Sequence, residues 1–142
     1  MPTPVTASLH ELVLAMDGHS DRLLARRFGA DHNLFAFLSP LREGPLDLTR
    51  LAQRLNLTRA AVSKRVPLLE RDGWVRTTSD PGHGRRVLVS LTGRGAELVE
   101  EASALLNQRF AGLLAGLGID AEALNDHLRL IIAAIRALPE ED

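Results

Sequence analysis

The sequence contains no cysteine, which excludes disulfide bridges, thiolate metal sites and cysteine-based redox switches. It also has no apolar run approaching the roughly 18 residues needed to cross a bilayer. The first residues (MPTPVT) lack the basic and apolar regions of a signal peptide. We therefore expect a cytoplasmic protein.

Motifs typical of enzymes are missing as well. The sequence has no nucleophile elbow, no P-loop, no HExxH zinc motif and no pair of carboxylates at a site-like spacing. His10, His19 and His32 could combine with Asp17 and Asp31 in a metal site. Because no two of them have the i, i+4 spacing of helical metal ligands, we favour solvated or core histidines. We expect a protein that is not an enzyme and has no cofactor or metal.

Charge is distributed unevenly along the 142 residues, although the net charge is only −1. Residues 1–49 carry a net charge of −2, and residues 95–142 carry −6. Residues 50–94 contain ten basic and three acidic side chains, a net charge of +7. A basic segment between acidic ends is typical of a chain in which one segment meets phosphate. The alternative is a solvated, arginine-rich surface.

The spacing of apolar residues predicts helices at both ends of the chain. Intervals of three and four residues over 5–28 indicate an amphipathic helix, and a short helix is predicted over 33–41. The same intervals predict helices over 93–114 and from Asp120, an N-cap, to about Leu138. The length and the 45% hydrophobic content suit one folding unit with an ordinary core.

The middle of the chain has the pattern of a helix-turn-helix. Residues 43–46 (EGPL) indicate a turn, after which Asp47 is the predicted N-cap of a helix that ends near Asn56. Thr58 is predicted to cap a second helix that runs to about Arg71. Two helices joined by so short a connection form a helix-turn-helix. The buried stripe expected on the second helix is Ala61, Val62, Val66 and Leu69, with Leu68 at its margin.

The period then changes to that of strands. Residues 74–78 and 87–91 are predicted to be strands, separated by the turn-rich stretch 79–84 (SDPGHG). The expected fold is therefore mainly α with a small β-hairpin wing (α+β), a winged helix-turn-helix flanked by N- and C-terminal helices.

This layout and its local sequences resemble the MarR family of winged helix-turn-helix regulators. Residues 48–76 (LTRLAQRLNLTRAAVSKRVPLLERDGWVR) are similar to the family's helix, turn and recognition helix, followed by Leu-Glu, a glycine and Val-Arg. Residues 85–92 (RRVLVSLT) resemble its second wing strand and the Leu-Thr that opens the next helix. The ends of the chain match only in helical layout.

The resemblance implies a single MarR-like chain, 1–142, that works as a homodimer. Residues 33–92 would form the winged helix-turn-helix lobe, and residues 1–32 plus 93–142 the helical dimerisation region. The implied partner is double-stranded DNA with a pseudo-palindromic operator, the default outcome is repression, and a small-molecule effector releases the DNA. The alternative is a winged-helix dimer that acts as a protein-interaction module without specific DNA binding, which the basic middle of the chain opposes.

Candidate DNA contacts lie at the start of the recognition helix and on the wing. Side chains at the N-terminal end of such a helix face base edges in the major groove, and Arg59 suits bidentate reading of guanine. For Arg59 and Lys64 the alternative is a solvated face. Pro67 removes a backbone hydrogen bond at a cost of about 3 kcal/mol and predicts a kink beyond the reading end. The candidate DNA-binding residues are Thr58, Arg59, Ala60, Ser63, Lys64, Arg65, Arg85 and Arg86.

The wing carries two neighbouring arginines. Strand alternation directs Arg85 and Arg86 to opposite faces, so only one can enter a minor groove, and the resemblance favours Arg85. The family commonly has an aspartate two residues before this arginine, a position that falls on His83. Either the acidic partner is missing, or Asp80 folds across the tip to replace it. The alternative function of these charges is to prevent edge aggregation of the hairpin.

The first and last helices carry more apolar surface than a chain of this size easily buries alone, which predicts a twofold partner. The alternative is that these residues complete the core of the monomer. The candidate dimerisation residues are Leu9, Leu12, Met16, Leu128, Ile131, Ile132 and Ile135.

A site for the effector is implied by the resemblance alone. It would lie between the dimerisation helices and the DNA-binding lobe, and the residues available there form no motif. The candidate ligand-binding residues are His10, Asp17, Arg22, His32 and Phe35.

Overall fold

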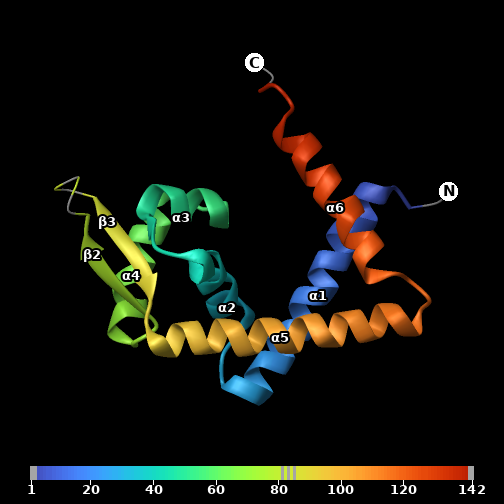
Figure 1. The fold of residues 1–142 in the computed structure, drawn as a ribbon, viewed down its shortest axis with the longest axis horizontal. Helices are drawn as coiled ribbons and strands as arrows, with labels where there is room; N and C mark the ends of the chain where they lie inside the picture. Colours follow the sequence, from blue (N-terminus) through green and yellow to red (C-terminus); the bar gives the residue numbers. More distant parts are fainter. Residues whose placement is uncertain (1–2, 81, 83, 85, 141–142) are drawn as a thin grey trace. The chain divides into compact units, whose positions relative to one another are not determined.

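The computed structural model of the chain describes residues 3–80, 82, 84 and 86–140. Helices dominate, and a small antiparallel sheet lies among them, so the predicted fold class is confirmed (Figure 1). The chain consists of two compact units, Met1–Ser103 and Ala104–Asp142. The elements are α1 (Val5–Phe28), α2 (His32–Leu38), the 3-10 helix η1 (Ser39–Glu43), β1 (Leu46–Asp47), α3 (Leu48–Leu55), α4 (Arg59–Arg71), β2 (Val75–Ser79), β3 (Val87–Leu91), α5 (Gly93–Gly116) and α6 (Ala121–Arg136).

The predicted helix-turn-helix is formed by α3 and α4, and its ends are those expected from the capping residues. The Asp47 carboxylate accepts a hydrogen bond of 2.7 Å from the Arg50 N–H, and the Thr58 hydroxyl accepts one of 3.1 Å from the Ala61 N–H. Each cap satisfies a backbone donor that a helix leaves free at its start. Asn56 ends α3 in the left-handed region at φ 53°, a conformation that asparagine tolerates better than most residues.

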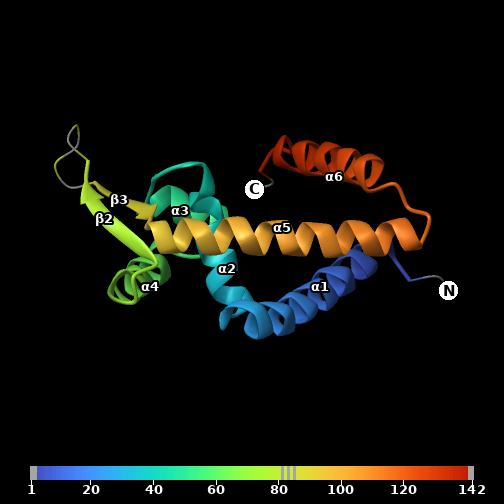
Figure 2. The ribbon, with the colours of Figure 1, turned by 60° about the horizontal axis from the view of Figure 1, so that its bottom comes forward.

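The wing is part of a three-stranded antiparallel sheet with the order β1-β3-β2. Val89 at the centre of β3 pairs with Leu46 of β1 on one side and with Thr77 of β2 on the other. The interpretation of residues 43–46 as a turn is therefore wrong at Leu46, which lies in a strand. A strand of two residues is too short to show alternation in the sequence, and its partner is more than 40 residues away. Figure 2 shows the β2–β3 hairpin beside α4.

The short second helix ends earlier than predicted. The α-helix stops at Leu38, and the chain continues as the 3-10 helix η1 instead of extending to Leu41. Pro40 accounts for the change, because proline has no N–H to donate to a carbonyl in the preceding turn. Gly44 then turns the chain into β1 at φ 142°, a value that favours glycine.

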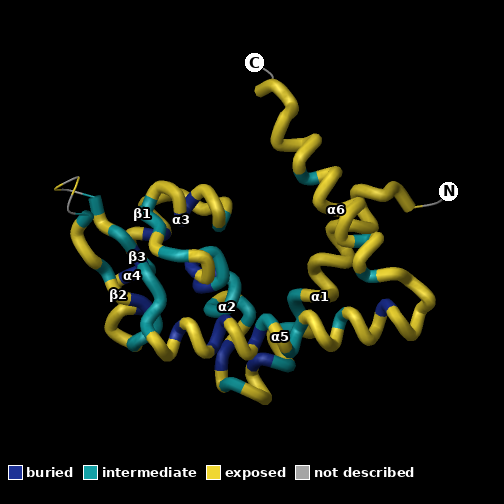
Figure 3. The backbone as a smooth tube through the Cα atoms, in the orientation of Figure 1, coloured by how far each residue is buried: buried dark blue, intermediate teal, exposed yellow. Residues whose placement is uncertain are grey.

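The core of the first unit is apolar. In Figure 3 the buried segments of this unit lie near the end of α1, in α2, η1, α3 and α4, in the sheet and in the first half of α5. On α4 the buried stripe is narrower than predicted, since Ala61 and Leu68 are exposed. None of the described helices combines the length and apolarity that crossing a membrane would require. The buried residues of the first unit are Leu24, Ala30, Phe37, Leu38, Leu41, Leu51, Ala52, Val62, Val66, Leu69, Val75, Val89, Leu98, Val99 and Ala102.

The start of α5 is locked to the segment that follows α4. The Thr92 hydroxyl donates to the Gly73 carbonyl at 2.7 Å and accepts from the Gly95 N–H at 3.1 Å. The Thr92 N–H donates to the Trp74 carbonyl at 3.1 Å. A Cβ atom added at Gly95 would overlap the Trp74 carbonyl oxygen. The glycine is therefore needed for this close approach and not for its own backbone angles.

This overlap predicts opposite effects for two glycines of α5. Gly95→Ala should lower the free energy of unfolding by about 1–3 kcal/mol, because the Trp74 backbone must move. Gly112→Ala should raise it by up to about 1 kcal/mol, since a Cβ there meets no neighbour and alanine favours a helix. Urea denaturation at one fixed protein concentration measures both values. Equal effects of the two substitutions would contradict the packing at Gly95.

Candidate nucleic-acid interface

The N-terminal half of α4 presents one bare face. Arg59, Ala60, Ser63 and Lys64 are exposed, whereas Val62, which lies between them in the sequence, is buried in the core. A helix that buries one stripe must expose the opposite one, so the burial at Val62 fixes which side chains face outward. The structure thus brings four of the predicted DNA-binding residues onto one surface.

Thr58 lies at the start of this face and is also exposed. Its hydroxyl accepts the capping hydrogen bond described above, and a hydroxyl oxygen has a further lone pair and a proton to offer. Capping and contact with DNA are therefore compatible at this residue.

Arg65 lies apart from the bare face, although it was predicted to bind DNA with the others. Its side chain is half-buried, and its guanidinium carbon lies 4.8 Å from the centre of the Phe37 ring. A guanidinium at this distance from an aromatic face is held by a cation–π interaction. The structure thus gives Arg65 a partner within the protein. Pro67 is exposed, and α4 continues past it to Arg71.

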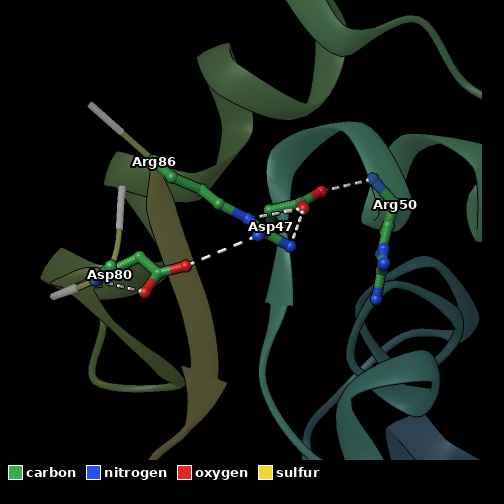
Figure 4. A network of polar contacts seen from close by, with 5 residues as sticks. Asp47, Arg50, Asp80 and Arg86 are labelled. Carbon is green, nitrogen blue, oxygen red and sulfur yellow. Dashed lines mark hydrogen bonds and ion pairs between the residues drawn. The ribbon is translucent and has the colours of Figure 1, made fainter. Parts of the chain in front are cut away.

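Arg86 is also engaged within the protein. Its Nε and Nη2 atoms donate to Oδ2 of Asp47 at 2.9 and 2.6 Å, and its Nη1 lies 3.5 Å from Oδ2 of Asp80 (Figure 4). The carboxylate of Asp47 comes from the start of α3, and that of Asp80 from the residue that follows β2. We name this network of Asp47, Arg86 and Asp80 the wing clamp. It joins the wing to the helix-turn-helix.

The clamp includes the one carboxyl group with a clear pKa shift among the described residues. The pKa of Asp47 lies below its ordinary value of 3.8. The hydrogen bond from the Arg50 N–H is the largest cause, and the hydrogen bonds and charge of Arg86 add to it, while burial acts in the opposite direction. Asp47 is therefore an anion throughout the neutral range.

Asp80 pairs with Arg86 at the base of the wing. Its N–H also donates to the Arg86 carbonyl at 2.8 Å, and its Oδ1 accepts from the Gly82 N–H at 3.1 Å. The predicted minor-groove residue Arg85, like His83, lies outside the described residues. The alternative in which Asp80 folds across the tip to partner Arg85 stays a prediction.

A hollow of about 540 Å³ lies between the recognition helix and the wing. Arg59 contributes to its wall from α4, Asp47 and Thr49 from the start of α3, and Gly84 and Arg86 from the wing. The clamp thus borders the space that separates Arg59 from the wing.

Two of the predicted ligand-binding residues meet where α1 and α2 pack together. Nε2 of His32 lies 3.3 Å from Oδ1 of Asp17, and the His32 N–H donates to Oδ1 of Asp21 at 2.9 Å. His10 and Arg22 are exposed on α1. Within the described residues, Nδ1 of His32 is buried without a partner, and no group of three metal-ligating side chains occurs.

Phe35 of α2 is half-buried. Asp21 was not predicted to take part in any site, because a lone aspartate on a helix gives no signal of a contact 11 residues away.

The predicted dimerisation residues are not covered in the single chain. On α1, Leu9, Leu12 and Met16 are exposed. On α6, Ile132 is half-buried. The other three predicted residues of α6 are exposed, namely Leu128, Ile131 and Ile135.

The pKa of Asp47 predicts how the clamp responds to acid. The pKa of Asp47 is lower in the folded than in the unfolded protein. The stabilisation of the fold by the ionised Asp47 carboxylate is therefore present above about pH 3.8 and is lost as the pH falls through the folded pKa. A carboxyl ¹³C NMR titration should give Asp47 a midpoint below 3.8. Arg86→Met should raise the midpoint but leave it below 3.8, since the Arg50 N–H remains. A wild-type midpoint above 3.8 would rule out the geometry described.

Comparisons with known proteins find a family match in the middle of the chain and solved structures with a similar fold. Residues 35–86 match the model of the MarR family, and a search of curated proteins finds no match. Solved structures share the fold over nearly all of the chain. A MarR/EmrR family transcriptional regulator from Acinetobacter sp. ADP1 is 26% identical, with a TM-score of 0.74 over 92% of this chain and 91% of that one.

Two further structures are similar at lower identity. Sco3205, a MarR family transcriptional regulator from Streptomyces coelicolor solved in complex with DNA, is 24% identical, with a TM-score of 0.73 over 99% of this chain and 94% of that one. NadR, solved in complex with 4-hydroxyphenylacetate, is 21% identical, with a TM-score of 0.79 over 98% of this chain and all of that one. The match of residues 35–86 covers the helix-turn-helix and the first strand of the wing, and the fold of the whole chain is similar to those of MarR family winged-helix regulators.

Proposed function

We propose that the protein is a transcription regulator that binds double-stranded DNA in a sequence-specific way. The bare face of α4 is the observation that carries this proposal. It presents Arg59, Ala60, Ser63 and Lys64 to solvent, in a segment of net charge +7. An exposed helix face of this kind fits the major groove, and the surrounding positive charge attracts the phosphate backbone.

Each side chain of this face has a chemistry that suits DNA. Arg59 can donate two hydrogen bonds to O6 and N7 of guanine, and the Ala60 methyl can contact the methyl group of thymine. Lys64 suits a phosphate, and the hydroxyls of Thr58 and Ser63 suit phosphates or base edges. Arg85 is our candidate for the minor groove beside this site, on the strength of the family resemblance.

We propose a homodimer that binds a pseudo-palindromic operator. Two recognition helices related by a twofold axis read two half-sites about one turn of DNA apart. The exposed apolar side chains of α1 and α6 support this proposal, since a partner would cover them. In this organisation residues 33–92 form the DNA-binding lobe, and residues 1–32 plus 93–142 the dimerisation region. The resemblance in fold to Sco3205, solved with DNA, adds support.

We further propose repression as the outcome, with release by a small molecule. The Asp17–His32 pair between α1 and α2, with Phe35 nearby in the sequence, is the proposed region for this effector. The resemblance in fold to NadR, solved with 4-hydroxyphenylacetate, supports an effector of this kind. An effector acts by binding better to a form whose DNA-reading heads are wrongly spaced. A regulator of this kind works where the genome lies, and we therefore propose a cytoplasmic location.

The proposed function is tested by selecting bound fragments from the host genome with purified protein. The affinity for the enriched duplex and for a scrambled duplex of equal length is then followed across a salt series. We expect a pseudo-palindromic site, bound at least roughly a thousandfold more tightly than the control, with a steep salt slope. Equal affinity for both duplexes would contradict sequence-specific binding, and absence of binding to either would favour the protein-interaction module.

The role of Arg59 yields a separate prediction. Arg59→Ala should weaken binding to the enriched duplex by about 5- to 150-fold, which corresponds to 1–3 kcal/mol for one bidentate contact. The melting temperature should stay constant, because the side chain is exposed. Arg109→Ala, which removes an exposed arginine of α5 outside the basic segment, is the matched control. Equal affinities of these two variants would remove Arg59 from the proposed site.

A further inference from the structure

We propose that Asp47 and Arg86 are positioning residues for DNA binding. In this proposal the wing clamp holds the wing at a fixed distance from the recognition helix, and neither residue of the pair touches DNA. The inference rests on the proposed function and deepens it. It also assigns Arg86 a role other than the direct DNA contact expected from the sequence.

All three guanidinium nitrogens of Arg86 face carboxylates. Two of them lie within 3 Å of the same Asp47 oxygen, and the third lies 3.5 Å from Asp80. The Arg86 side chain is only 33% exposed, and those of Asp47 and Asp80 are 15% and 20% exposed. Binding a phosphate would require Arg86 to leave two negative charges that are largely withdrawn from water. Separating an ion pair that is so enclosed is unfavourable unless each of the two charges finds a new partner.

The two carboxylates are themselves anchored. Oδ1 of Asp47 accepts the capping hydrogen bond from the Arg50 N–H, which leaves Oδ2 to face the wing. Asp80 is held by its backbone bond to Arg86 and by the Gly82 N–H. The clamp therefore links the first turn of α3 to both strands of the wing at the base of its tip (Figure 4).

The position of the clamp explains why this link matters for DNA. The hollow of about 540 Å³ has Arg59 on one side and the wing residues Gly84 and Arg86 on another. In the proposed complex, Arg59 and the wing tip must reach neighbouring grooves at the same time. Groups that act together need to be held within about 0.5 Å of their working geometry by supporting contacts. The clamp supplies such a contact between the two reading elements.

Positioning and simple electrostatics predict opposite results when the charge of Asp47 is removed. By electrostatics alone, losing a negative charge beside the DNA tightens binding, and a freed Arg86 tightens it further. If the clamp positions the wing, the same substitution weakens binding. Serine is the informative replacement, since it can still cap α3 while lacking the charge that binds Arg86.

The experiment compares Asp47→Ser, Arg86→Met and the double variant on the enriched duplex. Each single variant should bind at least about fivefold more weakly than wild type, and the double variant should bind no more weakly than the weaker single. The salt slope should equal that of wild type. Asp31→Ser is the matched control, because Asp31 caps α2 in the same way and forms no ion pair with an arginine among the described residues. It should bind like wild type.

Binding to duplexes of altered sequence distinguishes a loss of folded protein from a loss of wing position. Both clamp variants should lose discrimination against duplexes changed at the outer base pairs reached by the wing. They should keep it against duplexes changed where Arg59 reads. Uniform weakening on all duplexes would indicate instability and overturn the proposal. Hydrogen exchange without DNA gives an independent measure, because the Asp80 N–H should exchange faster in both variants while the Leu69 amide in the buried stripe does not.

Two further results would overturn the clamp while leaving the proposed function intact. One is tighter binding by Asp47→Ser. The other is a salt slope reduced by about 0.9 in Arg86→Met, which marks the loss of a direct phosphate contact. If wild type itself shows no preference for the enriched duplex, the proposed function fails instead, and faster exchange of the Asp80 N–H in the variants still supports the clamp.

Discussion

The burial of Val62, Val66 and Leu69 fixes the rotation of α4 about its own axis, and the rest of the proposed interface depends on that rotation. Because these three residues must face the core, Arg59, Ala60, Ser63 and Lys64 face solvent. The same core holds α3 beneath α4 and the sheet beside it. The chemistry available to DNA is thus selected by apolar packing before any polar side chain is considered.

Local signals explain why most of the fold could be predicted from the sequence. Asp47, Thr58 and Asp120 are capping residues at the starts of apolar-periodic segments, and the structure uses each of them as a cap. The features that could not be predicted depend on distant partners. β1 is defined only by its pairing with β3, and the Asp47–Arg86 pair joins residues 39 positions apart. No periodicity or spacing carries such a contact.

The basic segment also shows why a charge count does not identify contacts. The guanidinium of Arg65 lies over the Phe37 ring, and the guanidinium carbon of Arg94 lies 3.8 Å from the centre of the Trp74 ring. Arg86 lies between two carboxylates. These side chains stabilise the lobe, yet the charges of Arg65 and Arg94 still contribute to the field around it. A net charge of +7 therefore describes the attraction of the lobe for DNA, whereas the burial pattern of α4 decides which residues read it.

A wing held by carboxylates differs in its energetics from one held by phosphate. An arginine that contacts phosphate strengthens binding to every DNA sequence alike, because the backbone carries no sequence information. Arg86 is neutralised within the protein, so it adds little to non-specific attraction. It fixes the wing before DNA arrives, and the entropy of ordering the wing is then not lost on binding. For a regulator that must find one operator among many competing sites, the ratio of specific to non-specific affinity matters more than either value alone. An internal clamp raises that ratio. It holds the wing in the geometry that fits the operator, and it adds no positive charge that would strengthen binding to other sequences.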